Sequence, residues 1–435
     1  MAFPLGAVPH AALVMGEERI IPVPPLPRHR EGEILDELPN PAGLVLWQDV
    51  RHVRDWAESA PERRSGLFPP PTAETIAKRK DARAYAGELA PLLDVFAAMK
   101  TGPLHVKPAE LGRACERVVS WALEHDHAQT AIEWAEVAAL VDAASPRLAN
   151  LAGRVTRNAN LYDRAELWFK RGLGFARDQD DTIELIRGHL GYGTLCKEMG
   201  RVNGARRHLN AGANMAWREG PPSLAAEAQH DLCAMLIVRG HLAEAASRAQ
   251  KALTWYPKSH QRIPFFAADV ALMLVLGRRF LSAGRLVRLV LRSVQQPSAR
   301  ATILALGARA FSGAGEPEES AVLRRRALKL LDRHRGMEPV TRWHLADAQR
   351  LAGNWEAAEQ EAETTLAVAI GQNDREIERL TRILLKLIRR RKAAPPKTSG
   401  SREFHSFLNE LAERVSAWSP RRGDRPGPWG TDWAA

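Results

Sequence analysis

A helix-ending residue recurs at nearly regular intervals through the middle of the chain, and it constrains the fold more than any other feature. It occurs at Asp126, Asn160, Gly200, Gly240, Gly277, Gly315 and Gly353, at separations of 34, 40, 40, 37, 38 and 38 residues. Each follows an apolar stretch with helical spacing. Gly, and less readily Asn or Asp, adopts the left-handed conformation that ends a helix. The sequence therefore predicts a series of helix-turn-helix units.

Small residues accompany these helix ends in a fixed register. Five residues after each end stand Ala131, Ala165, Ala205, Ala245, Ser282, Ser320 and Ala358. Seven residues before each end stand Val119, Gly153, Gly193, Cys233, Val270, Ala308 and Ala346. Twelve residues after each end stand Ala138, Gly172, Gly212, Ala252, Leu289, Ala327 and Thr365. Facing small residues let two helices approach closely, so each unit is predicted to be a tightly packed helix pair.

This pattern resembles the tetratricopeptide (TPR) repeat, a unit of about 34 residues built from a helix, a turn and a second helix. Residues 165–172 and 245–252 resemble the family's second helix most closely, and Pro257 stands where the family commonly places a terminal proline. The longer units and Arg324, at a normally apolar position, depart from the family. The resemblance covers about residues 109 to 370. It implies an all-α, right-handed α-solenoid of about seven repeats.

Proline and charge predict the organisation around these repeats. Residues 1–40, rich in proline, are expected to form an extended arm, and residues 41–107 an N-terminal helical region with helices near 44–58, 73–87 and 89–100. The repeat solenoid is predicted over 108–372. A basic amphipathic helix over 373–394 is expected to cap it, because a repeat array must cover its last face. Residues 395–435 should form a linker, a short helix near 404–418 and a disordered tail.

The composition favours a soluble binding protein. No apolar run approaches the eighteen residues that would span a bilayer, and the N-terminus lacks the basic leading segment of a signal peptide. Cys115, Cys196 and Cys233 fit no disulfide framework and no zinc spacing, and Cys196 and Cys233 are expected to be buried. We therefore expect a cytoplasmic protein.

No sequence motif points to catalysis. The chain contains no HExxH, GxSxG, Walker-type or dinucleotide-binding motif. His125, Asp126 and His127 are consecutive at a helix end, and such residues rarely enclose a metal, so a polar turn is expected there. We predict that the protein is not an enzyme and has no cofactor and no metal site.

A basic, amide-rich surface on the first helices of the second and third repeats is the candidate binding groove, because first helices line the concave face in this architecture. Its residues are Arg147, Asn150, Arg154, Arg157, Asn158, Arg187, Thr194 and Lys197. In composition it resembles the TPR grooves in which Arg, Lys and Asn bind the acidic groups of a peptide. The alternative interpretation is a solvated helix face in an Arg-rich protein.

The C-terminal segment is the other candidate. Residues 375–435 contain fourteen Lys and Arg against seven Asp and Glu, and include the run Arg389, Arg390, Arg391 and Lys392. This basic tail is expected to cap the solenoid, and the alternative is contact with a membrane surface or nucleic acid.

The leading hypothesis is a scaffold or adaptor that binds a partner peptide or helix, with acidic character, in the concave groove. The alternative is a regulator that contacts nucleic acid through the basic C-terminal segment, although no DNA-reading module is recognisable. The sequence leaves the oligomeric state open.

Overall fold

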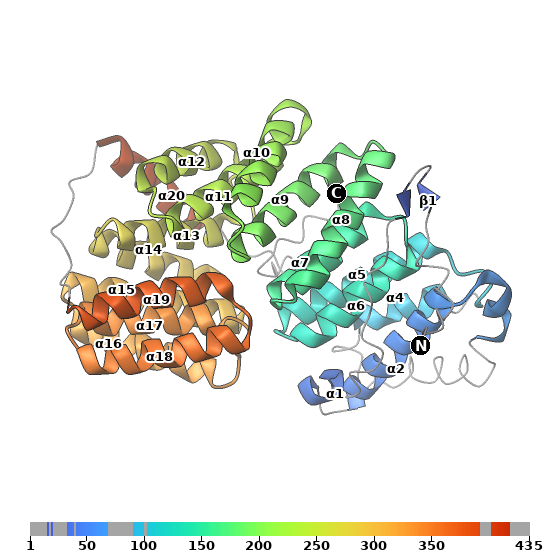
Figure 1. Cartoon of the computed structure of the whole chain (residues 1–435), viewed down its shortest axis with the longest axis horizontal. Coiled ribbons are helices and arrows are strands. Elements are labelled where there is room, and N and C mark those ends of the chain that lie inside the picture. The colour runs from blue at the N-terminus through green and yellow to red at the C-terminus, as the bar shows by residue number, and fades with distance from the viewer. Residues whose placement is uncertain are drawn as a thin grey trace, which may run out of the picture. The chain divides into compact units, whose positions relative to one another are not determined.

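The computed structural model describes residues 15–16, 19–20, 33–38, 41–67, 90–99, 102–391 and 402–417. Apart from the short antiparallel pair of β1 (Met15–Gly16) and β2 (Arg19–Ile20), their regular structure is helical (Figure 1). The chain forms two compact units, Met1–Tyr192 and Gly193–Ala435, each described here by itself. The predicted all-α repeat fold is confirmed.

The first unit begins with four short elements and continues with the first repeats. Its helices are α1 (Glu33–Glu37), α2 (Pro41–Glu58), the 3-10 helix η2 (Pro61–Gly66), α4 (Ala90–Met99), α5 (Pro108–Glu124), α6 (Ala128–Val141), α7 (Pro146–Asn158), α8 (Tyr162–Asp178) and the larger part of α9 (Thr182–Glu198).

The second unit continues the alternation of first and second helices. It contains α10 (Val202–Glu219), α11 (Pro222–Val238), α12 (Leu242–Trp255), α13 (Ile263–Leu276), α14 (Phe280–Ser293), α15 (Pro297–Ala314), α16 (Pro317–Leu331), α17 (Glu338–Leu351), α18 (Trp355–Gly371), α19 (Arg375–Arg389) and α20 (Arg402–Ala417). The odd-numbered helices α5 to α17 are the first helices of the repeats, and the even-numbered helices α6 to α18 are the second helices.

Within each unit, the helices pack consecutively in neighbouring pairs. Within repeats, α7 packs on α8, α11 on α12, α15 on α16 and α17 on α18; between repeats, α6 packs on α7, α10 on α11 and α14 on α15. The small residues make this possible. At Gly193, for example, an added Cβ would lie 2.7 Å from the Leu209 side chain. This is the consecutive pairing of a TPR-like solenoid.

Six of the seven predicted helix ends have the left-handed conformation. Asp126, Asn160, Gly200, Gly240, Gly315 and Gly353 have φ between 59° and 82°. The next residue donates its N–H to a carbonyl five residues back, as His127 does to Ala122 (2.8 Å) and Leu161 to Thr156 (2.9 Å). These bonds satisfy carbonyls that would otherwise lack a partner at the helix end.

The fifth repeat departs from the prediction by one residue. Gly277 has φ −81° and Arg278, with φ 60°, takes the left-handed conformation instead. The packing register moves with it, because Ala283 and Val290 are fully buried whereas Ser282 and Leu289 are half-buried. The shifted register places Ala271 and Ala283 at the facing small positions. Close packing therefore outweighs the roughly 1–2 kcal/mol that a left-handed non-Gly residue costs.

The N-terminal helices extend the core of the first unit. The structure has a helix, α1, inside the segment for which the sequence predicts an extended arm. Its Glu37 side chain accepts the N–H groups of Gln129 (3.1 Å) and Thr130 (3.0 Å) at the start of α6. A carboxylate there satisfies unpaired helix donors and opposes the positive end of the helix dipole. The rest of the predicted arm and the predicted helix at 73–87 lie outside the described residues, apart from β1 and β2.

A first prediction concerns the left-handed helix ends. An Ala side chain would meet no atom within 4 Å at either Gly315 or Gly371, but only Gly315 has positive φ. Gly315→Ala should therefore lower the free energy of unfolding by about 1–2 kcal/mol. Gly371→Ala, at the end of α18, should raise it by about 0.5–1 kcal/mol. Urea denaturation followed by circular dichroism measures both, and equal effects would contradict the role given to Gly315.

Candidate functional site

The eight predicted groove residues are less accessible than the sequence suggests. None of them is exposed, and Asn150 and Arg157 are buried, at 3% and 7% exposure. Arg147, Asn150, Arg154, Arg157, Asn158 and Arg187 belong to the first unit, and Thr194 and Lys197 to the second.

Asn150 joins the first helices of two successive repeats. Its Nδ2 donates to the Glu184 carbonyl and to Glu184 Oε2, both at 3.0 Å. Arg187 donates to Glu184 Oε1 at 2.7 Å. Burial raises the pKa of Glu184, although Arg187 and Asn150 favour the charged form. The Asn150 amide nitrogen and Arg187 therefore hold the buried Glu184, and Asn150 packs α7 against the first part of α9.

The remaining predicted groove residues are half-buried or interact with neighbouring side chains. Arg147 forms an ion pair with Glu116, and Arg157 donates to Asn158 Oδ1 at 2.9 Å. Lys197 Nζ lies 4.0 Å from Glu198 Oε1. A substitution of Arg157 by Glu would bury a carboxylate, so it cannot separate lost binding from lost stability.

The basic tail is divided between packing and exposure. In α19 the side chains of Ile377, Leu384, Leu385 and Ile388 are buried, and the helix packs on α18 and α17. Arg389 donates to Glu359 (2.7 Å) and Glu363 (3.0 Å) of α18. Arg390 and Arg391 are exposed, and Lys392 lies outside the described residues. These contacts make α19 the cap of the array.

The cap begins at a half-buried acidic group. Asp374 accepts the N–H of Ile377 at 3.0 Å, at the start of α19. Its pKa is raised to about 6, mainly by burial and also by Glu198, while the hydrogen bond and Lys197 act in the opposite direction. The folded chain therefore holds this proton more tightly than the unfolded chain does, and the charged form is a cost at neutral pH.

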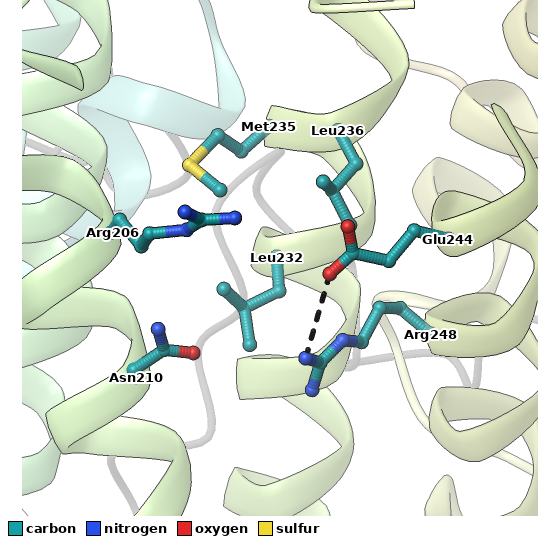
Figure 2. Close-up of a pocket in the computed structure, with 7 residues that line it drawn as sticks. All are labelled: Arg206, Asn210, Leu232, Met235, Leu236, Glu244 and Arg248. Atoms are coloured by element: carbon teal, nitrogen blue, oxygen red, sulfur yellow. Dashed lines mark ion pairs between the residues drawn. The ribbon is translucent and has the colours of Figure 1, made fainter. Parts of the chain in front are cut away.

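The described residues also contain an open groove that sequence reasoning missed. Its cavity of about 240 Å³ lies between the second helices α10 and α12, over α11 (Figure 2). We call it the second-helix groove, and its residues are Arg206, Asn210, Leu232, Met235, Leu236, Glu244 and Arg248. The three apolar residues of α11 form its floor and are 2% to 6% exposed.

The two walls of the second-helix groove differ in charge. On α12, Arg248 lies 3.8 Å from Glu244 and donates to Gln229 Oε1 at 3.1 Å. On α10, Arg206 is exposed and forms no ion pair with any residue that the structure describes. Figure 2 shows its guanidinium above the apolar floor and Asn210 beside it on the same wall. The free positive charge therefore lies on the α10 wall.

An exposed tryptophan pair continues along the same two helices. Trp217 of α10 stacks on Trp255 of α12, with ring centroids 4.5 Å apart and planes at 21°. Trp217 is 65% exposed. Trp217 follows Asn210, and Trp255 follows Arg248, by seven residues, or about 10 Å of helix. In the sequence, this site is indicated by the same seven-residue spacing between a polar residue and a tryptophan in both second helices.

The remaining candidates are structural. All three cysteines are buried, and burial raises the pKa of the Cys115 and Cys233 thiols, which makes them inert. The described residues include no cluster of three metal-ligating side chains. Among them, no helix has the length and apolar character needed to cross a membrane.

Comparisons with known proteins find likenesses among solved structures. No family model and no curated protein matches the chain. Among solved structures, the chain is similar to the TPR domain of P58(IPK), at 14% sequence identity and a TM-score of 0.22, over 74% of this chain and 99% of that one. The repeat description of this chain accordingly rests on its own helix order and packing.

A second prediction separates packing from binding in the first unit. Asn150→Ala removes both donors to buried Glu184, so it should lower the free energy of unfolding by about 2 kcal/mol. Asn158→Ala, at the half-buried end of the same helix, should cost less than about 1 kcal/mol. Thermal or urea denaturation compares them. Equal costs would show that the Asn150 contact is not structural.

A third prediction follows from Asp374. Asp374→Asn keeps an N-cap acceptor and removes the buried charge, so it should stabilise the chain at pH 7.5 by an amount on the order of 2 kcal/mol. The gain should shrink as the pH falls through 6 towards 4, because the wild-type carboxyl then binds its proton. Urea denaturation at pH 4.5 and 7.5 measures the difference, and a gain independent of pH would exclude this explanation.

Proposed function

We propose that the chain is a cytoplasmic interaction scaffold, without catalytic activity, that binds a segment of a partner protein on its repeats. The observation that carries the proposal is Arg206, an exposed cation that forms no ion pair within the described part of the chain and lies beside the apolar floor of the second-helix groove. A free guanidinium beside an apolar surface suits a ligand that brings a carboxylate and an apolar side chain together.

The walls of the groove select the orientation of this ligand. Arg206 and Asn210 offer hydrogen-bond donors on the α10 wall, whereas Glu244 repels a carboxylate on the α12 wall. The acidic group of the ligand therefore belongs on α10, and its apolar side chain on Leu232, Met235 and Leu236.

The tryptophan pair offers the ligand a further contact outside the cavity. The exposed face of Trp217 offers a stacking surface for an aromatic or proline side chain. An extended peptide advances about 3.3 Å per residue, so roughly three residues cover the 10 Å between Asn210 and Trp217. We infer an extended acidic peptide with an aromatic residue or proline about three positions from the acidic one.

The exposed cations of the basic tail are the basis of the alternative function, contact with nucleic acid. In the run from Arg389 to Lys392, Arg389 is already held by Glu359 and Glu363, whereas Arg390 and Arg391 are exposed. Arg375 and Lys386 of α19 are exposed too, and the nucleic-acid alternative rests on such exposed cations.

A fourth prediction tests the groove with a synthetic probe. A fluorescently labelled ten-residue peptide with one Glu, an adjacent Leu and a Tyr three positions from the Glu should bind the full chain. Arg206→Glu should weaken binding at least about tenfold, or roughly 1.4 kcal/mol. Arg207→Glu is the matched control, because Arg207 is exposed on α10 but does not line the groove.

Fluorescence anisotropy measures the affinities, with a Lys-for-Glu peptide as the negative probe. Equal losses at Arg206 and Arg207 would show a general charge effect. No binding of the Glu peptide to the wild-type chain would reject the groove as the site.

A further inference from the structure

The helix α20 does not extend the repeat array. Although it follows the capping helix α19 in sequence, it packs on α13 and α14, in the fifth repeat (Figure 1). Residues 390–401 connect it to α19. It therefore meets the solenoid as a separate amphipathic helix docked on a preformed surface.

An apolar stripe of α20 is buried in this contact. Phe407, Leu411 and Val415 are 6%, 0% and 1% exposed, and their spacing of four residues places them on one helix face. The residues between them, such as Asn409 and Glu413, are exposed. The contact thus has the form of a helix lying with one stripe in an apolar groove.

Arg414 makes polar contacts between α20 and the repeats. Arg414 Nη1 donates to the Leu253 carbonyl at 2.7 Å and to the Tyr256 carbonyl at 2.9 Å, both at the end of α12. Leu253 would normally receive the N–H of residue 257, but Pro257 has none. The N–H of His260 goes to Pro257 instead of Tyr256. The repeat sequence itself therefore leaves two carbonyls that need a donor.

The next repeat junction has an arginine of the array in the same place. At the end of α14, Arg300 of α15 donates to the Leu291 carbonyl (2.6 Å) and the Val294 carbonyl (2.9 Å). Arg300 lies fifteen residues before the left-handed Gly315, and the same count back from Arg278 reaches Ile263. The fifth repeat therefore has an apolar residue where the sixth repeat has this arginine. Arg414 of α20 supplies one from outside the array.

The residues around these carbonyls are fixed without α20. The Tyr256 hydroxyl lies 3.0 Å from His230 Nδ1, and His230 Nε2 lies 2.9 Å from Asp269. Arg262 forms ion pairs with Glu227 (2.9 Å) and Asp231 (2.6 Å). These contacts hold the turn between α12 and α13 on α11, so the docking surface is preorganised.

We propose that this surface, formed by the end of α12 with α13 and α14, is a docking site for an amphipathic helix of a partner protein. The helix it accepts has apolar residues at positions i, i+4 and i+8 and an arginine at i+7. In the chain alone, α20 occupies this site as a tethered copy of that ligand. This site lies apart from the second-helix groove, and the proposal does not depend on a peptide binding there.

The tether determines how a partner gains access. A segment joined by about a dozen residues is present at its site at an effective concentration in the millimolar range. A partner helix must displace it, so binding should be weak for the intact chain and tight once α20 is released. Any event that releases α20 from this surface would then regulate the binding of a partner helix.

The test uses a labelled peptide of residues 402–418, added to the full chain. Leu411→Asp should release α20 from its apolar site while leaving the repeats folded, because α20 lies beyond α19. The labelled peptide should bind this variant at least about tenfold more tightly than it binds the wild-type chain. Glu413→Lys, on the exposed face of α20, is the matched control and should behave as wild type.

Two further peptides test the pattern. A peptide with Arg414→Ala should bind the Leu411→Asp chain several-fold more weakly. An unrelated helical sequence carrying only the three apolar residues and the arginine at their spacing should bind it. Circular dichroism checks that the variant keeps its repeats, and Phe407→Asp serves as a second release variant if Leu411→Asp fails to fold. Equal binding to wild-type and release variants, or binding by the 402–418 peptide alone, would overturn the proposal.

Discussion

Reversal of the chain at the end of every first helix is the constraint on which the rest of the structure depends. A left-handed residue turns the chain, and two hydrogen bonds fix the angle at which the second helix leaves. The small residues then face each other, as Gly193 faces Leu209. Asp180 and Asn373 perform the same reversal between repeats, at the ends of α8 and α18. Without these turns no helix pair would bury its apolar stripe.

The second helices end with carbonyls that need donors, and arginines supply several of them. Arg171 of α8 donates to the Ala143 carbonyl after α6, and Arg300 of α15 does the same after α14. Where the fifth repeat has Ile263 in place of such an arginine, Arg414 of α20 takes over. Arginine suits this task because its guanidinium reaches two carbonyls at once. The same structural need thus accounts for contacts within the array and for the docking of a distant segment.

The two sites proposed for partners differ in physical character. The second-helix groove combines a free cation, Arg206, with an apolar floor, and favours an extended acidic peptide. The proposed α20 site combines apolar contacts with two carbonyls that accept from Arg414, and favours a helix that carries its own arginine. The charge requirements are opposite, so one partner segment does not satisfy both sites. The two proposals therefore concern two different ligands.

The sequence by itself determined the helix pairs, their approximate boundaries and the buried cysteines, because helix-ending residues and small residues act locally along the chain. It placed the fifth turn at Gly277, whereas the structure has it at Arg278, with Ala271 and Ala283 both fully buried. It assigned Asn150 and Arg157 to a groove, whereas the structure buries both. It predicted a helix near 404–418 but not the helices on which that helix packs. Partners such as Glu184 for Asn150, or the Leu253 carbonyl for Arg414, lie 34 and 161 residues away, and only the tertiary structure brings them together.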